Sequence, residues 1–171
     1  MTSDEALMLR FREGSRAAFE ELFERYRNPL YAFFRRRLAS KERVEDLTQE
    51  TFLAVIRGSE RYEPRASVRT YFFAIALKLL FAERRREGRE MASSMSDTAA
   101  NPAIESSLWV RRALEKLDSS EREMLMLREY EQLAYGEIAH LLQLPVNTVR
   151  SRLFRARAAL RQQLSPEEAW R

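Results

Sequence analysis

Five arginines lie close together near the carboxyl end of the chain. They are Arg150, Arg152, Arg155, Arg157 and Arg161. No aspartate or glutamate occurs between Thr148 and Leu164. A solvated helix face usually mixes both signs of charge, whereas guanidinium groups alone suit the phosphates and guanine edges of DNA. A basic helix with a purely structural role is the alternative, but the absence of acidic residues favours binding to nucleic acid.

Apolar spacing in the same segment indicates which side would face DNA. At 100° per residue, one apolar stripe consists of Val149, Leu153, Ala156 and Leu160. The opposite face carries Ser151, Phe154, Arg155 and Ala158. Small side chains let a helix enter the major groove deeply, and an aromatic ring can contact a thymine methyl.

A second short helix is predicted just before this one. Residues 137–142 have helical character, residues 143–146 including Pro145 read as a turn, and Asn147 is the expected N-cap of a helix from Thr148 to about Arg161. Two short helices joined by such a turn form a helix-turn-helix. The carboxyl-terminal part of the chain is therefore predicted to read the major groove of duplex DNA.

Few residues in the chain offer enzyme or metal chemistry. It has no cysteine and a single histidine, His140, and it contains no P-loop, GxSxG or HExxH motif. A lone imidazole without a second ligand is more often a surface or packing residue. We therefore expect a protein that is not an enzyme and that holds no metal and no cofactor.

Charge and hydropathy place the chain among cytoplasmic proteins. The 30 basic and 26 acidic residues give a net charge of +4, which is only a mild indication of a polyanionic partner. No stretch approaches the roughly 18 apolar residues of a membrane span, and residues 1–12 lack the pattern of a secretory signal. We expect no membrane insertion. The further arginine clusters at 35–37 and 84–86 fit either helix ends or anion-binding sites.

Apolar periodicity predicts an all-α protein of two small domains. One helix is expected from Ser15, bent or interrupted at Pro29; a second from Ser40, with Gly58 at its C-cap; and a third from Ser67 to the arginines before Gly88. These form an aromatic-rich domain over residues 1–87. Residues 88–104 lose the periodicity and are predicted to be a flexible linker. Residues 105–171 form the second domain, where residues 120–123 fit a capping box.

Three blocks of sequence give the chain a resemblance to the extracytoplasmic-function group of bacterial RNA polymerase sigma factors. The blocks are residues 46–52 (DLTQETF), residues 70–76 (TYFFAIA), and residues 135–139 (YGEIA) continuing through residues 148–157 (TVRSRLFRAR). Their order, their spacing and the position of the linker all fit, and the resemblance covers nearly the whole chain.

The resemblance implies that the chain directs core RNA polymerase to promoters. The helix of the first block would dock on the coiled coil of the polymerase β′ subunit, and the β flap is a further polymerase contact. Asp46, Gln49 and Glu50 would pair with basic groups there, while Leu47 and Phe52 would add apolar area. From the residues alone, an ordinary exposed helix surface is the better explanation of this block, and only the resemblance favours a polymerase contact.

The resemblance also implies two promoter contacts. Melted bases of the minus-ten element would contact a helix that carries Tyr71, Lys78, Arg84, Arg85 and Arg86. The loop at residues 58–66 would form one side of the pocket for a flipped base. Phe72 and Phe73, next to Tyr71, read as core. The minus-thirty-five duplex would meet Asn147, Thr148, Arg150, Ser151, Arg152, Phe154, Arg155 and Arg157, with Arg157 or Arg161 on a phosphate.

The chain departs from the family pattern at several positions. Tyr71 stands for the usual tryptophan, Leu77 and Lys78 for a frequent Arg-Asn pair, and Ala82 for a frequent acidic residue. In the second domain, Gln143 and Asn147 replace glycines, and residues 117–118 (Leu-Asp) replace a leucine-proline pair. Strand opening remains the expectation, but the preferred minus-ten bases do not follow from these residues.

Two other functions fit parts of the sequence. A stand-alone helix-turn-helix regulator with an N-terminal dimerisation or ligand domain would predict palindromic sites, yet it leaves residues 46–52 unexplained. A protein that sequesters another regulator would not need the acid-free arginine face. An anti-sigma protein is a further partner that the resemblance implies.

Overall fold

The computed structural model describes residues 1–93 and 108–165, and the regular structure within these residues is entirely helical. The predicted all-α class is confirmed. The chain divides into two compact units, Met1–Ala103 (unit 1) and Ile104–Arg171 (unit 2). The dividing point falls within residues 88–104, the segment predicted as a linker, most of which lies outside the described residues.

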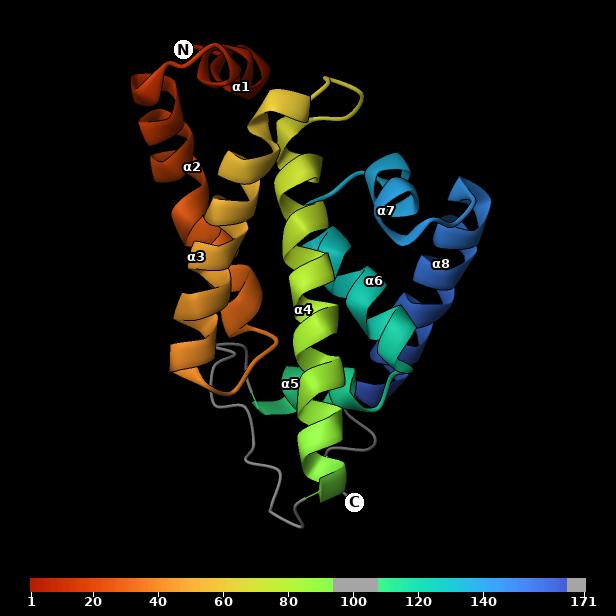
Figure 1. Ribbon diagram of the computed structural model, residues 1–171. Helices are drawn as coiled ribbons and strands as arrows, with labels where there is room; N and C mark the ends of the chain where they lie inside the picture. Colours follow the sequence, from red (N-terminus) through yellow and green to blue (C-terminus); the bar gives the residue numbers. More distant parts are fainter. Residues whose placement is uncertain (94–107, 166–171) are drawn as a thin grey trace. The chain divides into compact units, whose positions relative to one another are not determined.

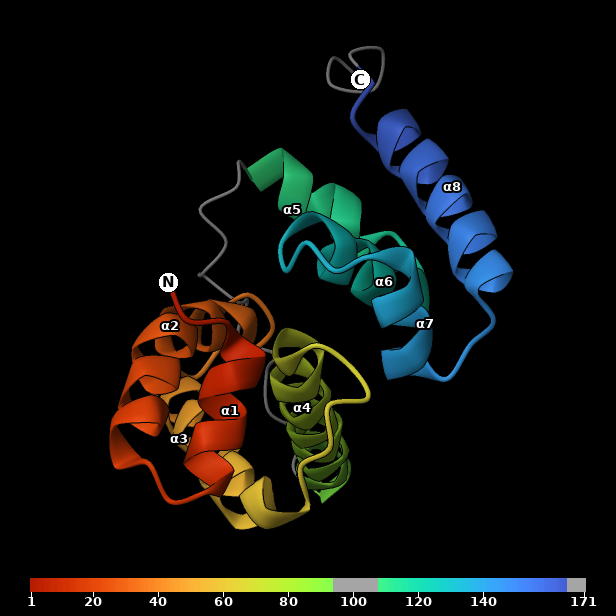
Figure 2. The same ribbon diagram turned by 90° about the horizontal axis from the view of Figure 1, so that it is seen from above.

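Unit 1 is a bundle of helices. It contains α1 (Asp4–Arg12), α2 (Arg16–Arg35), α3 (Lys41–Gly58), the 3₁₀ helix η1 (Ser59–Arg61) and α4 (Val68–Ser93). Serines 3, 15 and 40 cap α1, α2 and α3, since each hydroxyl accepts a hydrogen bond from a backbone amide three residues later. In Figures 1 and 2, α1 lies against the end of the bundle where α3 ends and α4 begins. Helix α1 was not expected from the sequence.

Aromatic side chains fill the centre of unit 1. Tyr26 of α2 stacks on Phe72 of α4 with the ring centroids 4.4 Å apart, and Phe33 lies 5.6 Å from Phe73. Phe33, Phe72 and Phe73 are fully buried, so the prediction that Phe72 and Phe73 belong to the core is confirmed. The predicted interruption at Pro29 does not occur, because α2 runs through it without a break.

Two helix ends in unit 1 differ from the prediction. The helix expected to end among Arg84–Arg86 continues past Gly88 to Ser93. A glycine inside an exposed helix costs only about 1 kcal/mol, and the Arg86–Glu90 ion pair spans this glycine and stabilises the last turns. Gly58 is the last residue of α3, but its φ of −91° is right-handed, so it is not the left-handed cap that was expected.

Unit 2 contains the predicted pair of short helices. Its elements are α5 (Leu108–Glu115), α6 (Ser119–Glu129), α7 (Tyr135–Leu142) and α8 (Val146–Gln163). The apolar side of α8 packs on α6 and α7 and buries Val149, Leu153 and Ala156 completely. The expected capping box at Ser120 is wrong, because Asp118 caps α6 instead: its carboxylate accepts from the Ser120 backbone amide at 3.1 Å.

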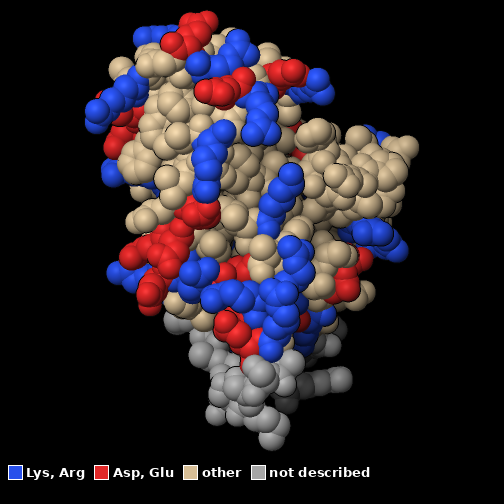
Figure 3. Space-filling model, in the orientation of Figure 1, with Lys and Arg blue, Asp and Glu red and all other residues tan. Residues whose placement is uncertain are grey.

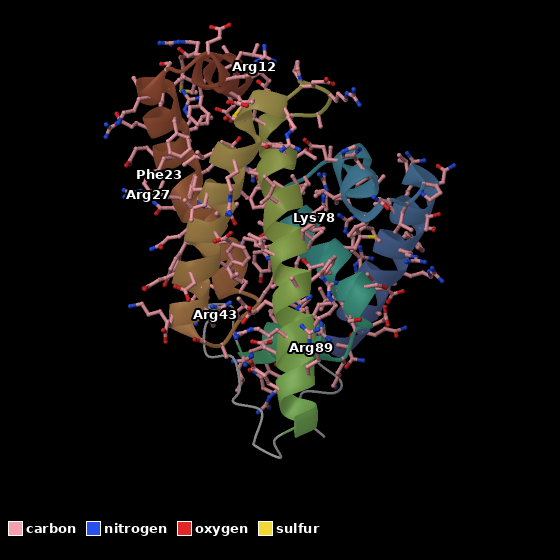
Figure 4. The ribbon with its side chains drawn as sticks, viewed as in Figure 1. Arg12, Phe23, Arg27, Arg43, Lys78 and Arg89 are labelled. Carbon is pink, nitrogen blue, oxygen red and sulfur yellow. The ribbon has the colours of Figure 1, made fainter. Side chains whose placement is uncertain are left out.

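A buried carboxylate joins α3 to α4. Glu83 is almost fully buried, and it accepts hydrogen bonds from Arg43 Nε at 2.9 Å and from Arg43 Nη2 at 2.6 Å. Arg86 donates a further bond at 2.7 Å, and Arg43 also reaches Asp46 at 3.0 Å. Arg43 is labelled on α3 in Figure 4. Hydrogen bonding to Arg43, which outweighs the effect of burial, lowers the pKa of Glu83 to about 2.

We expect Glu83→Gln to lower the free energy of unfolding by about 2 kcal/mol at pH 7, because a neutral amide replaces the buried carboxylate that accepts two hydrogen bonds from Arg43. A lowered folded-state pKa adds stability that is complete above the ordinary value of 4.5 and is lost as the pH falls through about 2. Urea unfolding at pH 7 and pH 3 should therefore show a smaller difference between variant and parent at pH 3. Glu45→Gln, at an exposed position of α3, is the control. An equal difference at both pH values would contradict the ionic role.

Candidate nucleic-acid interface

The turn between α7 and α8 sets the direction of the second helix. Glu137 accepts a hydrogen bond from the Ala134 backbone amide at 2.7 Å and so caps the start of α7. Gln143 ends α7 in the left-handed region with a φ of 54°. Pro145 precedes the first residue of α8, and its carbonyl accepts from the Thr148 and Val149 amides at 3.0 and 3.1 Å. Local hydrogen bonds thus define both helix ends.

The exposed face of α8 is the one that the sequence predicted. Ser151, Phe154, Arg155 and Ala158 are exposed, opposite the buried stripe. Phe154 is 75% exposed, so most of its ring is accessible to an external partner. Among the described residues, Arg155 has no ion-pair partner, so its guanidinium is available to an external acceptor. This face combines a small polar group, an aromatic ring and a cation.

Other side chains of α8 have intramolecular partners. Arg157 pairs with Glu129 at 2.8 Å and donates to the Tyr135 hydroxyl at 3.0 Å, so it ties α8 to α6 and α7. Its predicted DNA contact stays a prediction, and it would require the guanidinium to share or exchange these intramolecular bonds. Asn147 is inside the first turn of α8 and accepts from Arg150 at 3.3 Å, so its prediction as the N-cap is wrong.

The remaining α8 positions differ in exposure. Arg150 and Arg161 are exposed, whereas Thr148 and Arg152 are half-buried. Arg152 lies near enough to Asp118 to lower the pKa of that carboxyl, although hydrogen bonds from Ser120 have the larger effect. Arg161, the other residue predicted on a phosphate, keeps an accessible side chain.

An open pocket of about 700 Å³ lies in unit 1 where α3, the following loop and α4 meet. We call it the Tyr71 pocket. It is lined by Ala54, Arg57, Gly58, Arg61, Tyr62, Glu63, Arg65 and Tyr71. Tyr62 and Tyr71 make an edge-to-face contact with the centroids 5.3 Å apart. The pocket thus joins two aromatic rings and three arginines, the groups that bind unstacked bases and phosphates.

Helix α1 supports the loop that walls this pocket. Arg12, labelled in Figure 4, donates from Nη1 to the Tyr62 carbonyl oxygen at 3.0 Å. Glu5 accepts from the Val68 amide at 3.2 Å and so caps the start of α4. These two contacts join segments more than 40 residues apart, and they explain why a helix absent from the sequence prediction matters for the pocket.

The predicted cations of α4 are exposed along its surface. Lys78 lies at mid-helix in Figure 4, and basic side chains gather over the lower half of α4 in Figure 3. Arg84 and Arg85 are exposed as well, whereas Arg86 is held by Glu83 and Glu90. Tyr71 is half-buried, so one part of its ring is accessible and another belongs to the core.

The face of α3 that was predicted to bind a protein differs from the prediction at its two apolar positions. Asp46 and Gln49 are exposed and Glu50 is half-buried, but Leu47 and Phe52 belong to the core. Phe52 packs against Phe19, Phe23 and Phe72. Leu47 and Phe52 therefore do not supply the expected apolar contact area, apart from the small edge of Leu47 that lines a groove.

Leu53 and Ile56 are the exposed apolar residues on α3, with 49% and 42% of their surface accessible. Together with Asp46, Gln49 and Glu50 they form what we call the α3 surface. A groove of about 420 Å³ runs along it and is lined by Arg43, Asp46, Leu47, Gln49, Glu50 and Leu53. Leu53 follows Asp46 and Gln49 at helical spacing, so the periodicity could have identified it. Acidic side chains gather over α3 in Figure 3.

No helix in the described part of the chain is long and apolar enough to span a membrane. A group of histidine, cysteine and carboxylate side chains that could hold a metal ion is also absent from the described residues.

Two family models match the chain. Residues 22–90 match sigma-70 region 2, and residues 107–160 match sigma-70 region 4. An extracytoplasmic-function RNA polymerase sigma-E factor of Haemophilus influenzae is 30% identical, with 96% of each chain covered. The RNA polymerase sigma-H factor of Pseudomonas aeruginosa is 29% identical over 95% of this chain and 94% of its own.

Two solved structures resemble the fold over most of its length. CnrH, in complex with the cytosolic domain of CnrY, has a TM-score of 0.72 at 26% identity and covers 95% of this chain and 97% of its own. The sigma factor RpoE of Bartonella quintana, in complex with the anti-sigma factor NepR, has a TM-score of 0.71 at 25% identity. It covers 85% of this chain and 96% of its own.

We expect Gln143→Gly to stabilise the protein by about 1 kcal/mol, because a side chain in the left-handed region is strained and glycine is not. Gln162→Gly, in the exposed last turns of α8, should have the opposite sign and cost up to about 1 kcal/mol. Thermal unfolding of both variants measures the difference. A destabilised Gln143→Gly protein would show that the Gln143 side chain makes a stabilising contact of its own.

Proposed function

We propose that the two units of this chain, which belongs to the extracytoplasmic-function family of RNA polymerase sigma factors, bind different elements of the promoter. Sigma factors direct core polymerase to promoters, and the chain is a transcription initiation factor of this kind. The family is one of non-enzymatic factors, and we extend this to the chain itself. Its proposed place of action is the cytoplasm, where it would meet polymerase and promoter DNA.

In this proposal, unit 2 reads the minus-thirty-five duplex with the exposed face of α8. The observation that carries the proposal is that Ser151, Phe154 and Arg155 are exposed on a helix whose opposite side buries Val149, Leu153 and Ala156, with Leu160 of the same stripe half-buried. Arg155 would bond a base edge, and Phe154 would contact a methyl group in the major groove. Thr148, Arg150 and Arg152 would follow the backbone. Arg157 instead holds α8 in place.

Unit 1 would bind the melted minus-ten strand. The Tyr71 pocket is large enough for one unstacked base, and Arg57, Arg61 and Arg65 around it would neutralise phosphates. Lys78, Arg84 and Arg85 extend this cationic surface along α4. Arg86 would serve mainly through its contact with Glu83.

The α3 surface is the proposed contact with the coiled coil of the polymerase β′ subunit. It offers acidic and amide groups beside Leu53 and Ile56, which suits a partner that has cations around an apolar strip. The β flap is the proposed partner of unit 2. The two proteins of similar structure are each bound to a second protein, which for RpoE of Bartonella quintana is an anti-sigma factor, and this supports an anti-sigma partner for this chain as well.

Transcription in vitro tests the function directly. Purified chain, added to core polymerase and a library of promoter fragments, should produce transcripts from a subset that shares two elements. Binding of the chain alone should be weak and strongly salt-dependent, since one small module buries little area on DNA. Tight binding to palindromic sites by a dimer without polymerase would favour the stand-alone regulator instead.

We expect Leu53→Lys to weaken binding to core polymerase on the order of tenfold, because it places a strongly hydrated cation at the apolar part of the α3 surface. Thermal stability should change little, since half of the Leu53 side chain is already exposed. Ala17→Lys adds the same charge at an exposed position of α2 and is the control. Unchanged affinity of Leu53→Lys in a fluorescence titration would rule out this surface as the docking site.

We expect Arg155→Ala to cost about 1–3 kcal/mol of discrimination at one position of the minus-thirty-five element. Arg161→Ala should weaken binding to all promoters by a similar factor, because a phosphate contact carries no base information. Transcription from promoters with single substitutions in that element distinguishes the two effects. If Arg155→Ala keeps the parental preference at every position, the assignment of the exposed face is wrong.

A further inference from the structure

Gly58 lies unusually close to a side chain of the Tyr71 pocket. A Cβ atom at this position would lie 2.8 Å from the Tyr71 hydroxyl oxygen, closer than real Cβ contacts. The backbone does not require glycine here, because a φ of −91° suits any L residue. Glycine at position 58 therefore matters for the space beside it, which the end of the tyrosine side chain occupies.

The rest of the Tyr71 ring is held by aromatic neighbours. Tyr62 contacts it edge to face at 5.3 Å, and Phe72 does so at 6.3 Å. Burial raises the pKa of Tyr71, so its hydroxyl stays protonated at neutral pH. Among the described residues no group hydrogen bonds to this hydroxyl, so Gly58 provides space for it rather than a bond. The ring position depends on packing alone.

We propose that Gly58 is a positioning residue for the promoter contact of Tyr71. Gly58 leaves space beside the last turn of α3. The Tyr71 ring can therefore pack close to that helix, and the pocket stays open to an unstacked base. A methyl group at position 58 displaces the hydroxyl end, and since Tyr62 and Phe72 restrict the ring on other sides, the displaced ring narrows the pocket. This inference rests on the proposed minus-ten role of the pocket.

The position of the ring can be measured without DNA. The full chain is labelled with 3-fluorotyrosine, and the Tyr71 signal in the fluorine NMR spectrum is identified by its loss in Tyr71→Phe. We expect Gly58→Ala to shift this signal and to leave those of the tyrosines outside the pocket in place. Gly88→Ala, whose added methyl would have no neighbour within 4 Å, is the matched control and should leave all signals unchanged. An unshifted Tyr71 signal in Gly58→Ala overturns the proposal.

The consequence for promoter binding is measured with the holoenzyme on a DNA fork that has an unpaired minus-ten strand. We expect Gly58→Ala to weaken binding about tenfold, the size of a lost base-stacking contact, and Gly88→Ala to match the parent. The double variant Gly58→Ala with Tyr71→Phe removes the oxygen that the methyl meets, so its affinity should return to within about twofold of Tyr71→Phe alone. Absence of this rescue overturns the steric explanation.

A further variant separates this proposal from the function on which it rests. If Tyr71→Ala weakens binding to the fork but Gly58→Ala does not, the pocket binds DNA and only the role of Gly58 is wrong. If Tyr71→Ala has no effect on binding, the minus-ten role of the pocket fails, and the proposed role of Gly58 fails with it. Binding to a minus-thirty-five duplex should be the same for all variants and shows that each protein is folded.

Discussion

The ionic contact between Glu83 and Arg43 joins α3 to α4, and both proposed surfaces of unit 1 depend on how these two helices lie against each other. Helix α3 carries the proposed polymerase contact and ends at Gly58, while α4 begins near Tyr71 and carries the cations. Removal of the Glu83 charge takes away the carboxylate that joins Arg43 to α4, so the stability lost on substitution is expected to exceed the net stability that the contact contributes. Because Arg43 also holds Asp46, the same cluster orients a side chain of the α3 surface.

Periodicity along the chain was sufficient to predict the parts of the site that depend on one helix. The buried and exposed sides of α8 follow from the spacing of Val149 and Leu153, and the structure confirms them. For α3, the resemblance identified a functional block but not which of its side chains point outward, so Leu47 and Phe52 were assigned to the wrong side. Contacts between distant segments, such as that of Gly58 with Tyr71, leave no pattern that a single sequence can reveal.

Departures from the family pattern in unit 2 have local physical explanations. Asp118, in place of the usual proline, has a backbone φ of −54° that proline would also adopt, and its carboxylate caps α6 instead. Gln143, in place of glycine, keeps the left-handed turn at the cost of some strain. The fold of the helix-turn-helix therefore tolerates both substitutions, because the first supplies an equivalent interaction and the second costs little compared with the burial of α8.

Different residues of α8 account for the stability of unit 2 and for the proposed recognition of the promoter. Arg157 lies on the same helix but bonds to α6 and α7. Ser151, Phe154 and Arg155 bury little surface within unit 2, so substitution there changes what the helix would recognise and hardly changes the fold. Arg157 differs from them, since its bonds to Glu129 and Tyr135 join α8 to α6 and α7. When the buried residues hold the helix in place, its exposed side chains can differ without a change of fold. The same fold can therefore recognise many promoters.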